Sequence, residues 1–125
     1  MSQEAMEEVA KKGICSIESI EKLKHIADEL DMEPNRSGIL DCERILKAAA
    51  DRTRIKLLLL LSRGEMCVCQ LTAISDLKQP AISSSLRILE RAGLLRREQR
   101  GKWHYYSLTD SRIIPLIHRL VERRD

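Results

Sequence analysis

Apolar residues recur at three- and four-residue steps along much of the chain, and this spacing predicts amphipathic helices. The first such stretch runs from Ile17 to Leu30, and Ser16 is its expected N-cap. A linker is expected over residues 34–38, which include Pro, Asn, Ser and Gly. A second helix is expected from about Leu40.

The next helix is expected over residues 52–62, with Asp51 as its cap and Gly64 as its end. Residues 57–61 are all Leu, so this helix is apolar nearly all round and should lie at the centre of the core. A short helix is then expected over residues 67–74.

Pro80 fits the first turn of a further helix, where a missing N–H costs nothing. Two strands, 94–100 and 102–108, flank Gly101 and predict a β-hairpin. The buried stripe of the Pro80 helix is expected to consist of Ile82, Leu86 and Leu89.

A final helix is expected after the hairpin, with Thr109 or Asp110 as its cap and Pro115 in its first turns. Its apolar side is formed by Ile113, Ile114, Ile117, Leu120 and Val121. The order of helices, hairpin and helix predicts a mainly α winged helix-turn-helix. Residues 1–36 are expected to form an N-terminal extension, and residues 37–125 are expected to form the winged helix-turn-helix domain.

Charge is unevenly distributed along the 125 residues. Residues 1–34 carry a net charge of −5, so the remainder carries +8, and six Arg or Lys lie within residues 87–102. A basic cluster of this kind is typical of a polyanion partner, although a solvated face is the commoner explanation of charge clusters.

Composition narrows the class of protein further. With 43% hydrophobic residues and no Phe, the core must be aliphatic. The chain has no apolar run of 18 residues, so no membrane span is expected. Its first residues do not resemble a secretory signal, so we expect a cytoplasmic protein. Its four cysteines should then be reduced, for metal binding, redox sensing or packing.

In a helix-turn-helix the second helix lies in the major groove and the wing reaches phosphates or the adjacent minor groove. Three residues lie opposite the buried stripe and are candidates for determining DNA sequence specificity, namely Ser83, Ser84 and Arg87. The same geometry also occurs as plain packing. The full set of DNA-binding candidates is Gln79, Ser83, Ser84, Ser85, Arg87, Arg97, Arg100 and Lys102.

Several stretches resemble the ArsR/SmtB family of repressors, in the family's order and spacing. The resemblance implies a homodimeric winged-helix repressor that binds operator DNA and releases it when a metal or metalloid ion binds. Many members have a His near Ser84 or Ser85, where this chain has serines. The matching runs are ILKAAADRTRI at 45–55, EMCVCQL at 65–71, QPAISSSL at 79–86, LERAGLL at 89–95 and GKWHYYSL at 101–108.

Cys67 and Cys69 form a Cys-x-Cys pair. Thiolates prefer soft ions such as Cd(II), Pb(II), Zn(II) and As(III). Residues two apart on a regular helix do not face each other, but a pair at a helix N-terminus can chelate. From the residues alone, two small buried hydrophobic side chains are an equally good interpretation; with the resemblance, a ligand pair is favoured.

The resemblance also indicates where further ligands lie. The arsenite-sensing branch has a third Cys at the position that Thr72 occupies here. The cadmium- and lead-sensing branch takes thiols from the N-terminal extension, usually of the other subunit. Cys15 is therefore the expected third ligand, and Cys42 is a candidate fourth that equally suits packing.

The family's other metal site, on the last helix, is not expected here. It needs a His where this chain has Arg112 and a later His where it has Arg123, so Asp110 lacks its partners. The three His of the chain have no partners at ligand spacing.

The sequence therefore predicts a metal-responsive repressor, with a thiol-redox-responsive repressor as the first alternative. A protein- or RNA-binding winged-helix module is a further alternative, which the basic hairpin disfavours. No enzyme is expected, because the chain has no catalytic motif, phosphate loop or paired carboxylates in a credible pocket.

Overall fold

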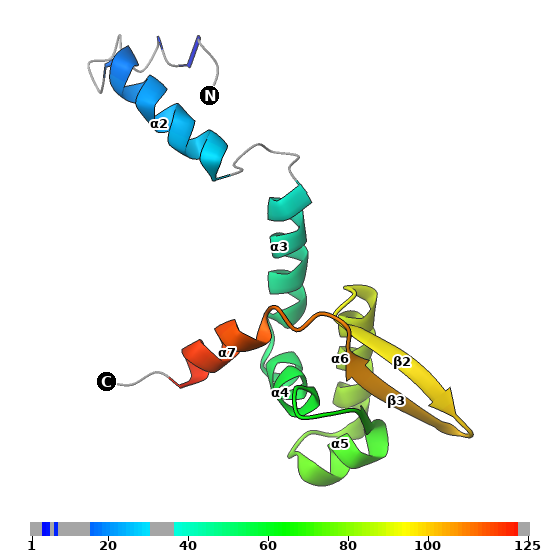
Figure 1. Cartoon of the computed structure of the whole chain (residues 1–125). Coiled ribbons are helices and arrows are strands. Elements are labelled where there is room, and N and C mark those ends of the chain that lie inside the picture. The colour runs from blue at the N-terminus through cyan, green and yellow to red at the C-terminus, as the bar shows by residue number, and fades with distance from the viewer. Residues whose placement is uncertain (1–3, 6, 8–15, 31–36, 123–125) are drawn as a thin grey trace. The chain divides into compact units, whose positions relative to one another are not determined.

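The computed structural model describes residues 4, 5, 7, 16–30 and 37–122 of the chain. The chain divides into two compact units, residues 1–42 and 43–125, so the division falls inside helix α3 (Ser37–Ala49). Each unit is described by itself. The second unit carries the helix-turn-helix and the hairpin (Figure 1).

Helix α2 (Ile17–Glu29) is the helix of the first unit that the apolar spacing predicts. The hydroxyl of Ser16 accepts a hydrogen bond from the backbone N–H of Ser19 at 3.1 Å, so the predicted cap is confirmed. Of the apolar stripe, Ile20 is buried, whereas Leu23, Ile26 and Leu30 are at least half exposed. Most of the stripe is therefore free to contact another surface.

Helix α3 begins at Ser37, earlier than the sequence indicates. Ser37 and Gly38 are helical and not part of a linker. The rest of the predicted linker, and Cys15, lie outside the described residues.

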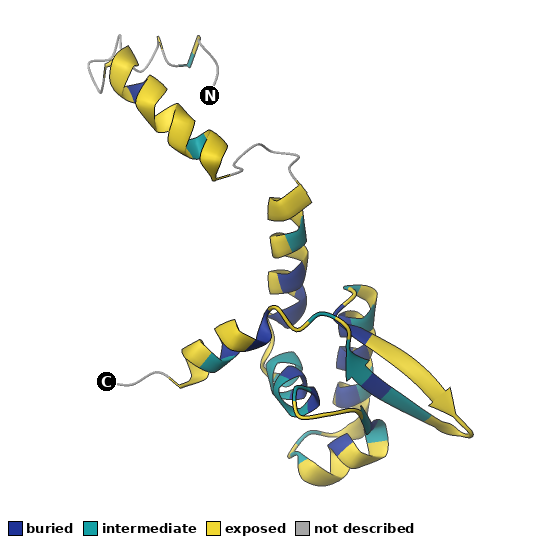
Figure 2. Ribbon diagram, in the orientation of Figure 1, coloured by how far each residue is buried: buried dark blue, intermediate teal, exposed yellow. Residues whose placement is uncertain are grey.

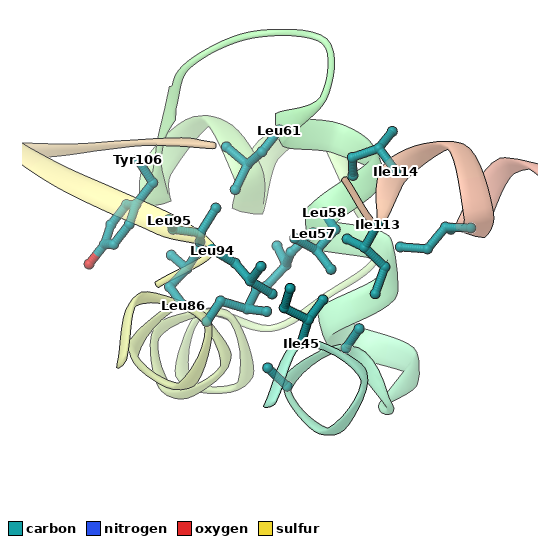
Figure 3. Close-up of a cluster of buried hydrophobic side chains, with 14 of the residues drawn as sticks. Ile45, Leu57, Leu58, Leu61, Leu86, Leu94, Leu95, Tyr106, Ile113 and Ile114 are labelled. Carbon is teal, nitrogen blue, oxygen red and sulfur yellow. The ribbon is translucent and has the colours of Figure 1, made fainter. Parts of the chain in front are cut away.

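The core of the second unit forms around helix α4 (Arg52–Leu61), which packs against α6 and α7. Asp51 caps α4 as predicted, with its carboxylate accepting from the N–H of Arg54 at 3.1 Å. Leu57 and Leu58 have no exposed surface. The surrounding side chains are aliphatic apart from Tyr106, as Figure 3 shows.

Helices α5 (Val68–Ile74) and α6 (Gln79–Arg91) form the helix-turn-helix. The helix expected from Cys67 begins one residue later, because Cys67 belongs to a short strand, β1 (Met66–Cys67), that the sequence did not predict. Gly93 follows α6 with φ +80°, a conformation that favours glycine, so the predicted helix end is confirmed.

Strands β2 (Leu95–Arg100) and β3 (Trp103–Leu108) form the predicted hairpin around Gly101. The sheet is antiparallel with the strand order β1-β3-β2, so β1 pairs with the edge of β3 that β2 does not occupy. Beyond Leu95, every residue of β2 is exposed (Figure 2). The hairpin therefore extends from the core as a wing.

Helix α7 (Ile114–Val121) begins later than expected, and the prediction that Thr109 or Asp110 caps it is wrong. The Thr109 hydroxyl instead donates to the Gly93 carbonyl at 2.8 Å. Asp110 accepts from the N–H of Arg112 at 3.1 Å, in the turn before the helix. Pro115 does lie in the first turn.

The apolar side of α7 is divided between the core and the surface. Ile113, Ile114 and Ile117 are buried, whereas Leu120 and Val121 are 78% and 61% exposed.

Within the described residues, no helix is long and apolar enough to cross a membrane.

Candidate DNA-binding and thiol site

The recognition helix α6 buries one face and exposes the other. Ile82, Leu86 and Leu89 have no exposed surface, as the spacing predicts. Gln79, Ser84 and Arg87 are exposed, and Ser83 is half-buried. The exposed side therefore offers two small residues for close approach and one long cation for a base edge or a phosphate.

Ser85 is the exception among the predicted DNA contacts. Its side chain is only 6% exposed, on the same face as Ile82 and Leu89. A side chain in the protein interior cannot reach a base, so the assignment of Ser85 to DNA is corrected. Ser84, by contrast, is exposed and donates its hydroxyl to the Ala81 carbonyl at 3.2 Å.

The wing carries cations with different surroundings. The Lys102 ammonium lies in the turn of the hairpin, 5.3 Å from the centre of the Trp103 ring, and its residue is exposed. The Arg97 guanidinium is 3.7 Å from a Glu90 carboxylate oxygen. Exposed cations at these positions can attract DNA phosphates without regard to sequence.

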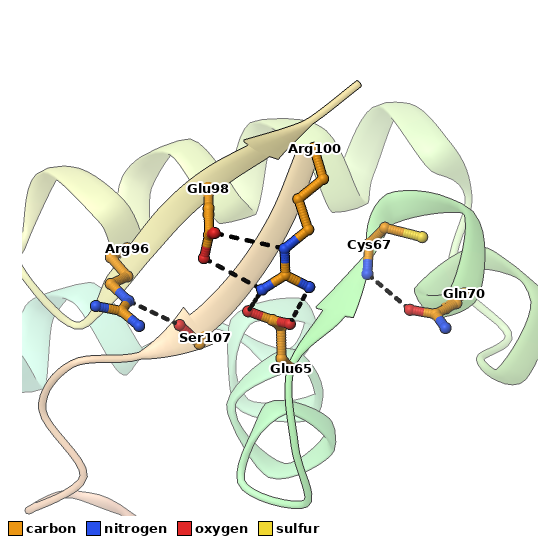
Figure 4. A network of polar contacts seen from close by, with 7 residues as sticks. All are labelled: Glu65, Cys67, Gln70, Arg96, Glu98, Arg100 and Ser107. Carbon is orange, nitrogen blue, oxygen red and sulfur yellow. Dashed lines mark hydrogen bonds and ion pairs between the residues drawn. The ribbon is translucent and has the colours of Figure 1, made fainter. Parts of the chain in front are cut away.

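Arg100 differs, because two carboxylates surround it (Figure 4). Its Nη1 lies 2.7 Å from Oε1 of Glu65, and its Nη2 donates to Oε2 of Glu98 at 3.2 Å. These hydrogen bonds, that of Glu98 first and that of Glu65 second, raise the pKa of Arg100 above its ordinary value. Sequence reasoning missed Glu65, which lies 35 residues away from Arg100.

Cys67 and Cys69 lie where β1 passes into α5. Cys67 is buried and is the residue before the first turn of the helix, while Cys69 is exposed in that turn. The backbone N–H of Cys67 donates to the Gln70 side chain at 2.9 Å (Figure 4). The predicted location of the pair at a helix N-terminus is therefore what the structure has.

Both thiol residues line one cavity of about 550 Å³. Gln79, the first residue of the recognition helix, and Lys102, in the turn of the wing, line the same cavity. The remaining lining residues are Val68, Thr72, Ala73, Trp103 and His104. One space is thus bounded by the thiols and by both of the elements expected to contact DNA.

The two thiols of this cavity are soft donors, but two donors alone do not complete a metal site. Within residues 4, 5, 7, 16–30 and 37–122, no group of three or more His, Cys, Asp or Glu side chains could hold a metal ion. The hydroxyl at position 72, where one branch has a third thiol, donates to the Val68 carbonyl at 2.8 Å. Cys42 is exposed on α3, in the first unit.

His104 lies in this cavity with an unsatisfied ring nitrogen. Its Nδ1 is buried and has no hydrogen-bond partner among the residues that the structure describes. Sequence reasoning left this His unassigned, and its position in a strand gave no signal for the cavity.

Asp110, after the hairpin, is bound by Arg112. The Arg112 Nη2 donates to Oδ2 of Asp110 at 2.7 Å, and these hydrogen bonds lower the pKa of Asp110 to about 2. The carboxylate that the family's second metal site would use is therefore ion-paired.

Comparison with known proteins identifies the relationship. The family described as "Bacterial regulatory protein, arsR family" matches residues 51–97. The "Arsenical resistance operon repressor" of Bacillus subtilis is 38% identical over 88 residues, which are 69% of this chain and 84% of the relative. The chain belongs to the ArsR family. The predicted family is confirmed.

Two other ArsR-family relatives differ in how much of their length is matched. The "Arsenic resistance transcriptional regulator ArsR1" of Pseudomonas putida is 46% identical over 65 residues, 51% of each chain. The chain therefore spans about half of that relative. The "Cadmium resistance transcriptional regulatory protein CadC homolog" of Staphylococcus aureus is 30% identical over 109 residues, 86% of this chain and 88% of the relative.

Similar solved structures confirm the winged helix-turn-helix. HlyU from Vibrio cholerae has a TM-score of 0.64 and 28% identity, over 70% of this chain and 99% of its own. A homodimeric winged helix-turn-helix DNA-binding domain from Mycobacterium bovis has a TM-score of 0.59 and 26% identity, over 72% of this chain and 84% of its own. The chain thus has the winged helix-turn-helix fold of these structures.

Proposed function

We propose that this protein is a metal-responsive repressor that binds operator DNA as a homodimer and leaves it when a soft ion binds Cys67 and Cys69. The observation that carries the proposal is the shared cavity. The two thiol residues, the first residue of the recognition helix (Gln79) and the turn of the wing (Lys102) all line it. Whatever occupies this space acts on the DNA-contacting elements.

The positions of the two thiols suggest how occupancy would act. Cys69 lies on α5, which packs against α6, and Cys67 lies on β1, which pairs with β3 of the wing. Two thiolates that share one ion are drawn together, so the recognition helix and the wing move relative to each other. DNA contact needs both elements in register with the groove, and a shift at either one weakens binding.

The ion needs more donors than this pair. We propose that Cys15 of the partner subunit is the third ligand and that Cys42 is a candidate fourth. Three thiolates suit Pb(II) or As(III), while four suit Cd(II) or Zn(II) in a tetrahedral arrangement. The names of the relatives, which refer to arsenic and to cadmium, point to the same group of ions.

The proposal is tested by titrating the full-length protein with Cd(II), Pb(II), Zn(II) and As(III), each in the absence and presence of a fluorescent operator selected from random duplexes. At least one ion should give thiolate-to-metal charge-transfer absorption and release the DNA at the same stoichiometry. If all four ions leave the DNA bound, the protein is not a sensor of soft metals.

We propose that the dimer forms through apolar surfaces that a single chain leaves exposed. Leu116 and Leu120 on α7 are 56% and 78% exposed, and Leu23 and Leu30 on α2 are 60% and 64% exposed. Surfaces of this kind are typical of an interface. A two-fold symmetric dimer would recognise a palindromic operator. Its site of action would be the cytoplasm, where DNA and reduced thiols are found.

A redox switch is the second candidate, and the exposure of Cys69 favours it. Oxidants reach an exposed thiol before a buried one. Mass spectrometry of the peroxide-treated protein separates the two functions. Oxidation of Cys69 with loss of DNA binding would favour the redox switch, whereas release by metal alone favours the metal sensor.

A further inference from the structure

Glu65, Glu98 and Tyr105 surround the guanidinium of Arg100, and Figure 4 shows the two carboxylates. Glu65 contacts it at both terminal nitrogens, with Nη1 to Oε1 at 2.7 Å and Nη2 to Oε2 at 3.0 Å. Glu98 contacts Nη2 at 3.2 Å and Nε at 3.5 Å. The Tyr105 ring centre lies 4.7 Å from the guanidinium carbon.

These partners come from different parts of the sheet. Glu65 directly precedes β1, Glu98 lies on β2 and Tyr105 lies on β3. Because β3 is the middle strand, Arg100 connects both outer edges of the sheet across it. An exposed two-stranded hairpin is only marginally stable by itself, so a cross-link near its end fixes the direction in which it extends.

The charge of this cluster opposes contact with DNA. One guanidinium is matched by two carboxylates, so the group as a whole is negative. A phosphate that approached Arg100 would also approach Glu65 and Glu98 and would have to displace a bidentate pair. Lys102 differs, because its ammonium lies over an aromatic ring at the turn.

We infer that Arg100 is a wing-positioning residue, held by Glu65, and that it does not neutralise a DNA phosphate. The inference depends on DNA binding by this family and not on the proposed metal response. It replaces the expectation that Arg100 acts like Lys102. Glu65 becomes a residue on which DNA affinity depends without contact to DNA.

The first test compares Arg100→Lys with Lys102→Ala by the salt dependence of operator binding. Lys keeps the positive charge but lacks the planar fork that a bidentate pair with Glu65 requires. Arg100→Lys should weaken binding roughly twofold to fivefold, the size expected for one exposed ion pair, with an unchanged salt slope. Lys102→Ala should lower that slope by about one unit. Near-normal binding by Arg100→Lys would overturn the inference.

The second test uses the sign of the effect at Glu65. Glu65→Gln removes a negative charge near DNA, so it should tighten binding if Arg100 is a phosphate contact that Glu65 restrains. The inference requires the opposite, a loss of affinity of roughly twofold to fivefold. Equal or tighter binding by Glu65→Gln would contradict it.

The matched control is Glu65→Asp, which keeps the charge but is too short to reach both nitrogens. It should weaken binding as Glu65→Gln does, and wild-type affinity in Glu65→Asp would also overturn the inference. Thermal unfolding of all variants, followed by circular dichroism, establishes that each is folded at the temperature of the binding measurement.

Discussion

Cys67 of β1 lies directly opposite Tyr105 of β3 in the antiparallel sheet. The residue that begins the thiol pair is therefore part of the same hydrogen-bonded sheet as the wing. The Tyr105 ring in turn lies beside the Arg100 guanidinium, which Glu65 holds. In the proposed function, a change in the backbone at Cys67 would act on the wing through adjacent strands, without a long route through the core.

The first prediction separates base reading from phosphate attraction. Arg87 lies on the exposed side of the recognition helix. Arg87→Ala should therefore weaken binding to the operator by about 1–3 kcal/mol and binding to random duplex DNA by less. Lys102→Ala should weaken binding to both DNAs by a similar factor. Fluorescence anisotropy with the operator and with a scrambled duplex at several salt concentrations measures both effects.

Ser85→Ala is the matched control for the recognition helix, because Ser85 is buried whereas Ser84 is exposed. It should leave the preference for operator over random DNA unchanged. Equal losses on both DNAs for Arg87→Ala would show that Arg87 contacts phosphate and not a base.

The second prediction concerns the dimer. Wild-type protein should have twice the 14.4 kDa mass of one chain in light scattering at micromolar concentration. Leu120 is 78% exposed, so Leu120→Glu should leave the fold of the chain intact and place a charge in the proposed interface. We expect this variant to be monomeric and to bind the operator weakly.

Ser111→Glu introduces the same side chain at an exposed polar position before α7 and should remain dimeric. A monomeric wild type, or a Leu120→Glu variant that is still a dimer, would place the interface elsewhere.

The third prediction follows from the pKa of Asp110, which Arg112 lowers from 3.8 to about 2. A carboxylate whose pKa is lower in the folded state stabilises the fold above the unfolded pKa, and this contribution is lost as the pH falls toward 2. Asp110→Asn should therefore lower the free energy of unfolding at pH 7 by less than about 1 kcal/mol, because Arg112 is exposed.

Urea unfolding at pH 7 and at pH 2 measures this difference. The gap between wild type and Asp110→Asn should narrow toward pH 2. A gap of the same size at both pH values would assign the effect to packing or to the turn, and not to the charge of Asp110.

The sequence predicted helices α4 and α6 well, because Asp51 caps α4 and α6 buries a stripe with a regular period. Strand β1 could not be predicted, since two residues are too few to show alternation. Ser85 could have been predicted as buried, because it lies three residues after Ile82 and four before Leu89, on the buried face. Because Ser is polar, it was assigned to the DNA-facing side, although its spacing indicates the buried face.

Sites that depend on distant residues were harder to predict. Glu65 and Arg100 meet only because β1 joins the sheet of the wing, and no local pattern connects positions so far apart. The expected cap at Asp110 failed for a local reason, because Arg112 two residues later binds the same carboxylate. The Cys-x-Cys motif indicated the thiol pair, but only the fold places it in one cavity with Gln79 and Lys102.

The central claim is that an ion at Cys67 and Cys69 releases the operator. The most direct measurement titrates the releasing ion into operator-bound wild type, the Cys67→Ser, Cys69→Ser double variant and the Cys42→Ser variant, with release followed by anisotropy. We predict that the double variant binds DNA normally and stays bound, while wild type leaves the DNA and Cys42→Ser is affected least. A double variant that leaves the operator at the same ion concentration as wild type would contradict the account.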